Sequence, residues 1–220
     1  MNICIHQIRA VADGAEAEIS IEISNNGGAE TQHIKGKVSA AMLWELALPA
    51  SLKSPLSIDR NRCETILRCM KLYAAIKKGI DLLGYAKNTP KSLQNKLKMK
   101  GYPADIAEDA VAFLVEKGYI HENEDAQLFA ENLAQRKLYG SNRIRKELFA
   151  KGFSSGVIRE TMEFLEVDFA EICAARIDKT GGLSLFETPE TKNKTVASLL
   201  RYGFSYSDIR EAQEILRENE

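Results

Sequence analysis

Leu148-Phe149-Ala150-Lys151-Gly152-Phe153 is the stretch from which the fold can be worked out, because the chain contains it in three versions. An earlier copy reads Leu97-Lys98-Met99-Lys100-Gly101-Tyr102, and a later copy reads Leu199-Leu200-Arg201-Tyr202-Gly203-Phe204. The glycines are separated by 51 residues each time, with a leucine four residues before and an aromatic residue directly after. A constant period of this length indicates a tandem structural repeat.

Each copy predicts the end of one helix and the start of the next. The glycine is expected to end a short helix in the left-handed conformation, with the aromatic residue packing back onto the last turn. The next helix then begins two or three residues later, with Asp105, Ser155 and Ser207 as candidate N-caps. Another helix precedes each pair, at about residues 60–86, 123–138 and 166–178, so that each unit has three helices. Asp59 is the candidate N-cap of the first of these helices.

A single three-helix unit has a thin core, so neighbouring units are expected to bury their remaining apolar faces against each other. We therefore predict a mainly α protein whose tandem three-helix repeats form an elongated, curved array. We also expect a monomer, because stacked repeats satisfy their own apolar faces. The predicted divisions are a β-rich N-terminal extension and three helical repeats, at residues 1–50, 59–122, 123–165 and 166–220.

The β-rich extension is predicted from alternation. Ile19, Ile21 and Ile23 alternate with polar residues, the period of a half-buried strand. Two further predicted strands involve Ile3, Ile5 and Ile8, where the alternation slips by one residue, and residues 33–38; Asn25 to Gly28 suits a turn. The apolar stretch 42–48 is either a short helix or a strand and contains Trp44, expected to be a core or interface residue. Prolines and serines at about 49–58 mark the junction with the helices.

Composition excludes several classes of protein. The 220 residues are 45% hydrophobic and 28% charged, with a net charge of -1, as in ordinary globular proteins. No basic and apolar leader and no apolar run of membrane-spanning length is present, and the four cysteines form no C-x-x-C pair. We expect a reduced, cytoplasmic chain without a membrane partner.

No motif predicts catalysis or a cofactor. The phosphate-binding glycine loops and the paired-histidine zinc motif are absent, and the three histidines lie in unrelated segments. We therefore predict no catalytic, cofactor-binding or metal-binding residues.

Charge is segregated along the repeats. Five lysines and no acidic residue lie between Lys87 and Gly101, and the matching helices of the later copies are also basic, carrying Arg143, Arg145, Lys146 and Lys151, and then Lys192, Lys194 and Arg201. If the repeats stack in register, these helices form a basic stripe suited to phosphates or to an acidic protein groove. The alternative is that they are solvated helices whose basic residues complement the helix dipole.

The order of these motifs resembles the RecX family of bacterial recombination regulators. Tyr139-Gly140 leading into the Arg-rich helix up to Leu148, followed by Lys151-Gly152-Phe153, is similar to the family's most recognisable motif. Similar segments are Leu93 to Tyr102, Glu116 to Ile120 and Asp125 to Ala130, and the resemblance covers about residues 60–216. The chain departs from the family in its balanced net charge, in a linker before Asp125 that is one residue longer, in Ala126 replacing an acid, and in the irregular segment Thr180 to Pro189.

The resemblance implies a cytoplasmic protein that binds the RecA filament on single-stranded DNA and restrains its ATPase, strand-exchange and co-protease activities. It also implies contacts to RecA or DNA from basic side chains that bind rather than catalyse, namely Arg143, Arg145, Lys146, Lys151, Lys96, Lys98 and Lys100. Two other hypotheses stay open: a helical-repeat nucleic-acid-binding or adaptor protein with a partner other than RecA, and an enzyme whose site lies between the β-rich region and the helices.

Overall fold

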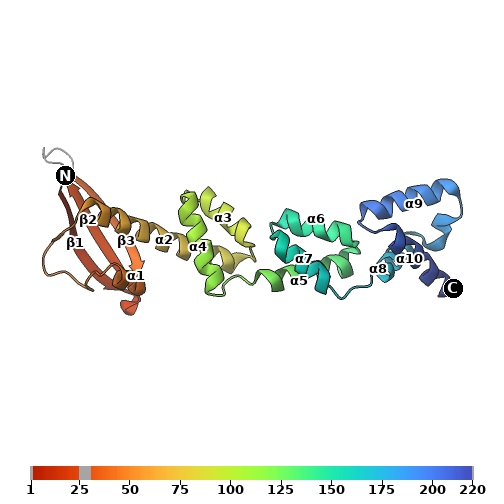
Figure 1. Cartoon of the computed structure of the whole chain (residues 1–220), viewed down its shortest axis with the longest axis horizontal. Helices are drawn as coiled ribbons and strands as arrows, with labels where there is room; N and C mark the ends of the chain where they lie inside the picture. The colour runs from red at the N-terminus through yellow and green to blue at the C-terminus, as the bar shows by residue number, and fades with distance from the viewer. Residues whose placement is uncertain (1, 25–30, 220) are drawn as a thin grey trace. The chain divides into compact units, whose positions relative to one another are not determined.

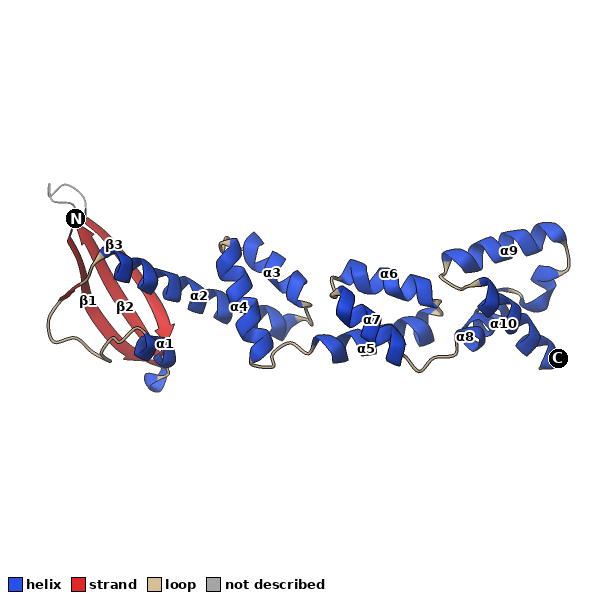
Figure 2. Cartoon of the chain, in the orientation of Figure 1, coloured by secondary structure: helices blue, strands red, loops and turns tan. Residues whose placement is uncertain are grey.

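The computed structural model describes residues 2–24 and 31–219. The chain divides into two compact units, Met1–Asn88 with Leu93–Tyr119, and Thr89–Ser92 with Ile120–Glu220. Figure 1 labels the elements in chain order, and Figure 2 separates the N-terminal strands from the helices that follow. A mainly helical fold with repeated helices after a small sheet is therefore confirmed. The division into four parts stays a prediction.

The N-terminal sheet is antiparallel, with strand order β3-β2-β1-β4. Its strands are β1 (Asn2–Val11), β2 (Glu16–Ser24), β3 (Thr31–Ser39) and the short β4 (Leu56–Ser57). Ile5 pairs with Ile21, but Gln7 pairs with Ser20, so one extra residue is accommodated in β1. This bulge returns Ile8 to the buried face and explains the slip in the alternation. The predicted turn at residues 25–28 lies outside the described residues.

The apolar stretch after β3 forms the short helix α1 (Ala40–Glu45), capped by the Ser39 hydroxyl. Leu43 of this helix joins the core of the sheet. Trp44 is 86% exposed, so it does not belong to the core, and its place in an interface stays a prediction. The reason is the helical period, which directs neighbouring residues to different faces.

One long helix, α2 (Arg60–Tyr85), serves both the sheet and the first repeat. Its first half lies along the sheet (Figure 1), and its Cys63, Ile66 and Met70 side chains are part of the core of the sheet. Its second half packs against α4, where Gly79 has no side chain and the space is filled by Leu114. The predicted cap is confirmed, because the Asp59 carboxylate accepts a hydrogen bond from the Arg62 N–H at 2.7 Å.

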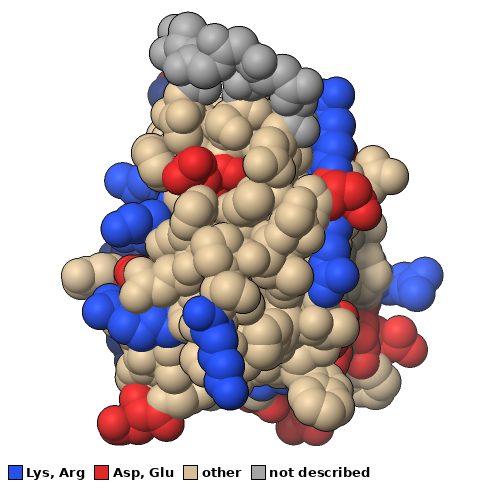
Figure 3. All heavy atoms as spheres, turned by 90° about the vertical axis from the view of Figure 1, so that its left-hand side faces the viewer, with Lys and Arg blue, Asp and Glu red and all other residues tan. Residues whose placement is uncertain are grey.

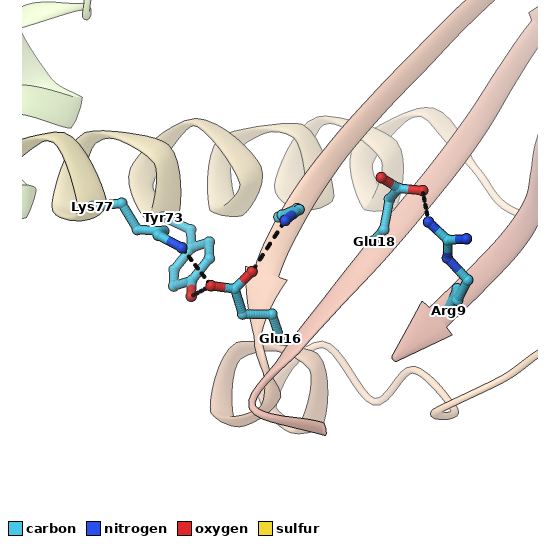
Figure 4. Close-up of polar contacts among 6 residues, drawn as sticks. Arg9, Glu16, Glu18, Tyr73 and Lys77 are labelled. Atoms are coloured by element: carbon cyan, nitrogen blue, oxygen red, sulfur yellow. Dashed lines mark hydrogen bonds and ion pairs between the residues drawn. The ribbon is translucent and has the colours of Figure 1, made fainter. Parts of the chain in front are cut away.

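A buried carboxylate connects the sheet to α2. Glu16, at the start of β2, accepts hydrogen bonds from Lys77 at 2.5 Å and from Tyr73 at 2.9 Å, and Lys37 of β3 lies 3.3 Å away (Figure 4). These donors, Lys77 foremost, lower the pKa of Glu16 from its ordinary value near 4.5 to about 2. The side chain is therefore ionised at neutral pH although it is largely shielded from solvent.

The remaining helices form the repeats. The first repeat adds α3 (Pro90–Met99) and α4 (Ala104–Glu116) to α2. The second contains α5 (Glu122–Lys137), α6 (Ser141–Lys151) and α7 (Ser155–Phe164). The third contains α8 (Phe169–Thr180), α9 (Pro189–Arg201) and α10 (Tyr206–Glu218), with a 3-10 turn at Gly182–Phe186 in the irregular segment.

The three glycines adopt the predicted conformation almost identically. The φ angles of Gly101, Gly152 and Gly203 are 91°, 95° and 95°. In each copy the N–H of the following aromatic residue donates to the carbonyl of the leucine five residues earlier, at 3.2 Å. The glycine N–H also donates to the carbonyl three residues back, which completes a Schellman motif. The leucines concerned, Leu97, Leu148 and Leu199, are all buried.

The predicted N-caps after these glycines are wrong by one or two residues. Ser154 caps α7 and Ser205 caps α10, whereas Pro103 begins α4 without a side-chain cap. The Schellman motif determines the direction in which the chain leaves the preceding helix. In all three copies the N-cap residue of the next helix therefore lies two residues after the glycine. Asp105 is already inside α4, where it pairs with Arg68 of α2, and this ion pair lowers the pKa of Asp105.

Alanine substitutions at the repeat glycines should separate the cost of the left-handed backbone from the cost of a close contact. Gly101→Ala should cost about 1 kcal/mol of stability, because nothing lies within 4 Å of the added methyl. Gly203→Ala should cost about 3 kcal/mol, because its methyl would also overlap the backbone of Arg143. Denaturant unfolding followed by circular dichroism measures both. Equal losses would contradict the close contact at Gly203.

Stability should depend on pH through Glu16. A carboxyl whose pKa is lower in the folded state stabilises the protein above the unfolded pKa, and this contribution is lost as pH falls through the folded value. We expect Glu16→Gln to be less stable than the natural protein at pH 7, with the difference shrinking from about pH 4.5 and disappearing near pH 2. Unfolding midpoints of both proteins over this pH range test it. A difference independent of pH would show that the charge of Glu16 is not what stabilises the contact.

Candidate functional site

The most distinctive surface of the described chain surrounds the basic helix α6. Leu138 adopts a left-handed conformation after α5, and the chain then enters α6 through Tyr139 and Gly140. The Gly140 N–H donates to the Tyr202 carbonyl at 2.9 Å, and the Asn142 N–H donates to the Gly203 carbonyl at 3.1 Å. The first turn of α6 is therefore hydrogen-bonded to the end of α9 in the next repeat.

Glycine is needed on both sides of this junction. A methyl group at Gly140 would overlap the backbone of Gly203 and Phe204, and one at Gly203 would overlap Arg143. The two repeats therefore meet backbone to backbone. This contact fixes where the first turn of α6 lies against α9.

Aromatic rings and guanidinium groups extend the same junction. The rings of Tyr139 and Tyr202 lie 5.9 Å apart. The guanidinium of Arg143 lies 5.4 Å from the Tyr139 ring centre, and that of Arg176 lies 3.1 Å from the Tyr202 ring centre. Arg176 also donates to the Lys137 carbonyl at 3.1 Å. Stacking of this kind contributes to stability through the attraction between a cation and the face of an aromatic ring.

An equivalent contact occurs 51 residues earlier. There the Thr89 hydroxyl donates to the Lys151 carbonyl at 3.3 Å, and Gly152 faces that hydroxyl. Thr89 and Lys151 correspond by the repeat spacing to Gly140 and Tyr202. The junction is thus a repeated structural device, made once with a side-chain hydroxyl and once with a backbone N–H.

The basic residues of α6 lie on two faces. Arg143 and Lys146 line a depression of about 440 Å³, together with Asn142 and Leu200, Arg201 and Gly203 of the next repeat. We call this the α6–α9 pocket.

Arg145 instead lines a depression of about 340 Å³ with Phe149 of α6 and Ser155, Ile158 and Arg159 of α7. We call this the α6–α7 patch. Phe149 is 65% exposed within it.

The predicted cations differ in how firmly they are held. Arg143 is paired with Glu147 at 2.7 Å, and Lys151 lies 5.6 Å from the ring centre of Phe129. In the described part of the chain no ion pair joins Arg145 or Lys146 to a carboxylate. These two charges are available to a partner.

The predicted residues of α3 lie in the first unit. Lys96 donates to the side-chain oxygen of Asn88, and Lys98 and Lys100 are exposed, without an ion pair among the described residues. Whether the basic helices form one stripe stays a prediction.

Residues missed by the sequence analysis include Asn142, Phe149 and Arg159. Arg201 stood among the basic residues of the third copy but was not selected. The repeat spacing could have indicated Arg201 and Phe149, since both lie within the copied segment. No signal in the sequence pairs Arg159 with Arg145, because their proximity depends on how α7 packs on α6.

Other parts of the structure offer less for binding or chemistry. Figure 3 shows the face at the sheet end of the first unit, where Lys and Arg side chains lie at both sides and in the lower middle, interspersed with Asp and Glu. Among the described residues no group of histidine, cysteine and acidic side chains could hold a metal ion, and no helix is long and apolar enough to cross a membrane. Burial raises the pKa of the Cys173 thiol to about 12, which makes it a poor nucleophile.

Comparisons with known proteins agree with the repeat pattern. No family model matches the chain. The regulatory protein RecX of Stenotrophomonas maltophilia (strain R551-3) is 31% identical over 144 residues, which are 62% of this chain and 83% of that protein. The regulatory protein RecX of Clostridium botulinum (strain Eklund 17B / Type B) is 29% identical over 171 residues, covering 76% and 80%. A crystal structure of regulatory protein RecX superposes with a TM-score of 0.69 at 19% identity, over 98% of this chain and 99% of that one.

The two basic residues of the α6–α9 pocket should differ in their effect on stability. Arg143→Ala removes an ion pair and a cation–π contact and should cost about 1 kcal/mol. Lys146→Ala removes neither and should change stability by less than about 0.5 kcal/mol. Denaturant unfolding of both variants measures this. If the two losses are equal, Arg143 is not held in place by Glu147 and Tyr139.

Proposed function

Because the chain belongs to the RecX family of regulatory proteins, we propose that it binds the RecA nucleoprotein filament and inhibits its ATPase, recombinase and co-protease activities. The family relationship supports a regulatory role, and the surface of α6 supports a binding mechanism. In this proposal the cations bind the filament and do not catalyse a reaction. Because the proposed partner is a filament in the cytoplasm, we propose that this protein also acts in the cytoplasm.

The observation that carries the proposal is the α6–α7 patch. It combines an exposed aromatic ring, Phe149, with the guanidinium groups of Arg145 and Arg159, which make no ion pair within residues 2–24 and 31–219. Aromatic and arginine side chains contribute most strongly to protein–protein interfaces when a partner desolvates them. The patch therefore suits a protein surface that offers an apolar pocket flanked by carboxylates.

Repeated units support binding to a repeated partner. A filament presents the same protomer many times, so several repeats can each make a modest contact. The total affinity then arises from contacts made together rather than from one deep pocket. In this proposal Lys96, Lys98 and Lys100 of the first repeat and Lys151 of the second make such additional contacts.

The second candidate is a nucleic-acid-binding or adaptor protein with a partner other than RecA. The cluster of cations at the α6–α9 pocket favours it, because such a cluster attracts any polyanion. The two candidates differ in whether binding needs the RecA filament, since an adaptor with another partner would leave RecA unaffected. The ATPase experiment separates them.

We expect the protein to inhibit the steady-state ATPase of RecA from the same source on single-stranded DNA, at near-stoichiometric ratios. Phe149→Ser should raise the concentration needed for half-inhibition about tenfold, the effect of losing one interface anchor. Phe164→Ser is the matched control, because Phe164 is 66% exposed, on α7 of the same repeat, and does not line the patch. It should inhibit like the natural protein.

Two outcomes would contradict this proposal. No inhibition by the folded natural protein would reject RecA as the partner and favour the adaptor hypothesis. Equal weakening by Phe149→Ser and Phe164→Ser would keep RecA as the partner but remove the patch as the site of contact.

A further inference from the structure

We propose that the α6–α9 pocket is a binding site for a backbone phosphate of single-stranded nucleic acid, held by Lys146 and Arg201 together with Arg143. The cations come from two different repeats, Arg143 and Lys146 from α6 and Arg201 from α9. The inference rests on the proposed function, because the proposed partner is a filament that contains single-stranded DNA. It assigns one face of α6 to the DNA and leaves the other to the protein.

The geometry of the pocket is set by the repeat junction. The Asn142 N–H donates to the Gly203 carbonyl. Because Gly203 has no side chain, the backbone of Arg143 can lie directly against it. This contact brings the start of α6 to the end of α9, and with them Lys146 and Arg201 to one depression. The cations are therefore placed by rigid elements rather than by a loop.

The charges are not needed to build the junction. The equivalent junction 51 residues earlier joins Thr89 to Lys151. At the positions corresponding to Arg143, Lys146 and Arg201 it has Ser92, Asn95 and Ala150. The first junction therefore forms with no basic residue at any of these three positions. Arg143 also pairs with Glu147 and stacks on Tyr139. Lys146 and Arg201 make no ion pair or ring contact in the described part of the chain, so a ligand is the account that we propose for them.

Phosphate fits this pocket better than a protein partner does. Its lining is polar, with the Asn142 amide beside the cations, and Leu200 is its one large apolar residue. The exposed ring that would anchor a protein, Phe149, lies in the α6–α7 patch instead. Phosphate recognition requires only cations and hydrogen-bond donors, without an apolar anchor. Neither Lys146 nor Arg201 is neutralised by a carboxylate in the described part of the chain.

The test is binding of fluorescent oligo(dT) to the full-length protein in the absence of RecA, measured by anisotropy over a range of salt concentrations. Lys146→Gln combined with Arg201→Gln should weaken binding about tenfold at moderate salt. Each lost phosphate contact should also reduce the slope of log affinity against log salt by about 0.7. The matched control combines Lys192→Gln with Arg210→Gln, which removes the same charges from exposed sites of the third repeat outside the pocket.

The expected result is a loss confined to the pocket variant, with both variants retaining the circular dichroism spectrum of the natural protein. Equal weakening by the control would overturn the proposal, since it would reveal general attraction rather than a site. Absence of oligo(dT) binding by the natural protein would also overturn it, while RecA inhibition would still decide the proposed function. If the pocket variant binds oligo(dT) normally but no longer inhibits RecA, the pocket contacts a protein carboxylate and the phosphate assignment is wrong.

Discussion

The hydrogen bond from the residue after each repeat glycine to the leucine carbonyl five residues earlier is the constraint on which the helical part of the structure depends. It forms only if the glycine adopts a left-handed conformation, which other residues reach at a cost. With that bond made, the aromatic residue is directed back onto the buried leucine and the next helix begins two residues later. The same glycines, at positions 152 and 203, then form the contact surface for an earlier repeat. One backbone conformation thus shapes both the interior of a repeat and its junction.

A second constraint operates in the first unit. Helix α2 buries Cys63, Ile66 and Met70 against the sheet and then continues into the first repeat without a break. The Glu16 network holds the start of β2 to the middle of this helix, at Tyr73 and Lys77. Because one continuous helix belongs to both cores, the sheet and the first repeat are not independent in structure. This is the physical reason why the sheet and the first repeat fall in one compact unit.

The sequence was sufficient where a local rule determines structure. The repeat period, the left-handed glycines, the bulge in β1 and the cap at Asp59 each depend on a few neighbouring residues. The caps at Ser154 and Ser205 could also have been found, because they keep the 51-residue spacing that Ser155 and Ser207 do not. By contrast, the exposure of Trp44 depends on how separate elements pack. The same holds for the depression that Arg145 and Arg159 both line. No local pattern contains that information.

The division of α6 into two faces follows from helical geometry. Arg143 and Lys146 are three residues apart and Arg145 and Phe149 are four apart, so each pair shares a face, while residues 143 and 145 do not. A net charge of -1 gives the protein little long-range attraction for a polyanion, so binding has to depend on where cations are concentrated. In the two proposals, these separate clusters on one rigid helix contact protein and nucleic acid at the same time. Replacing Arg143, Arg145 and Lys146 together would therefore remove both proposed contacts and could not distinguish them.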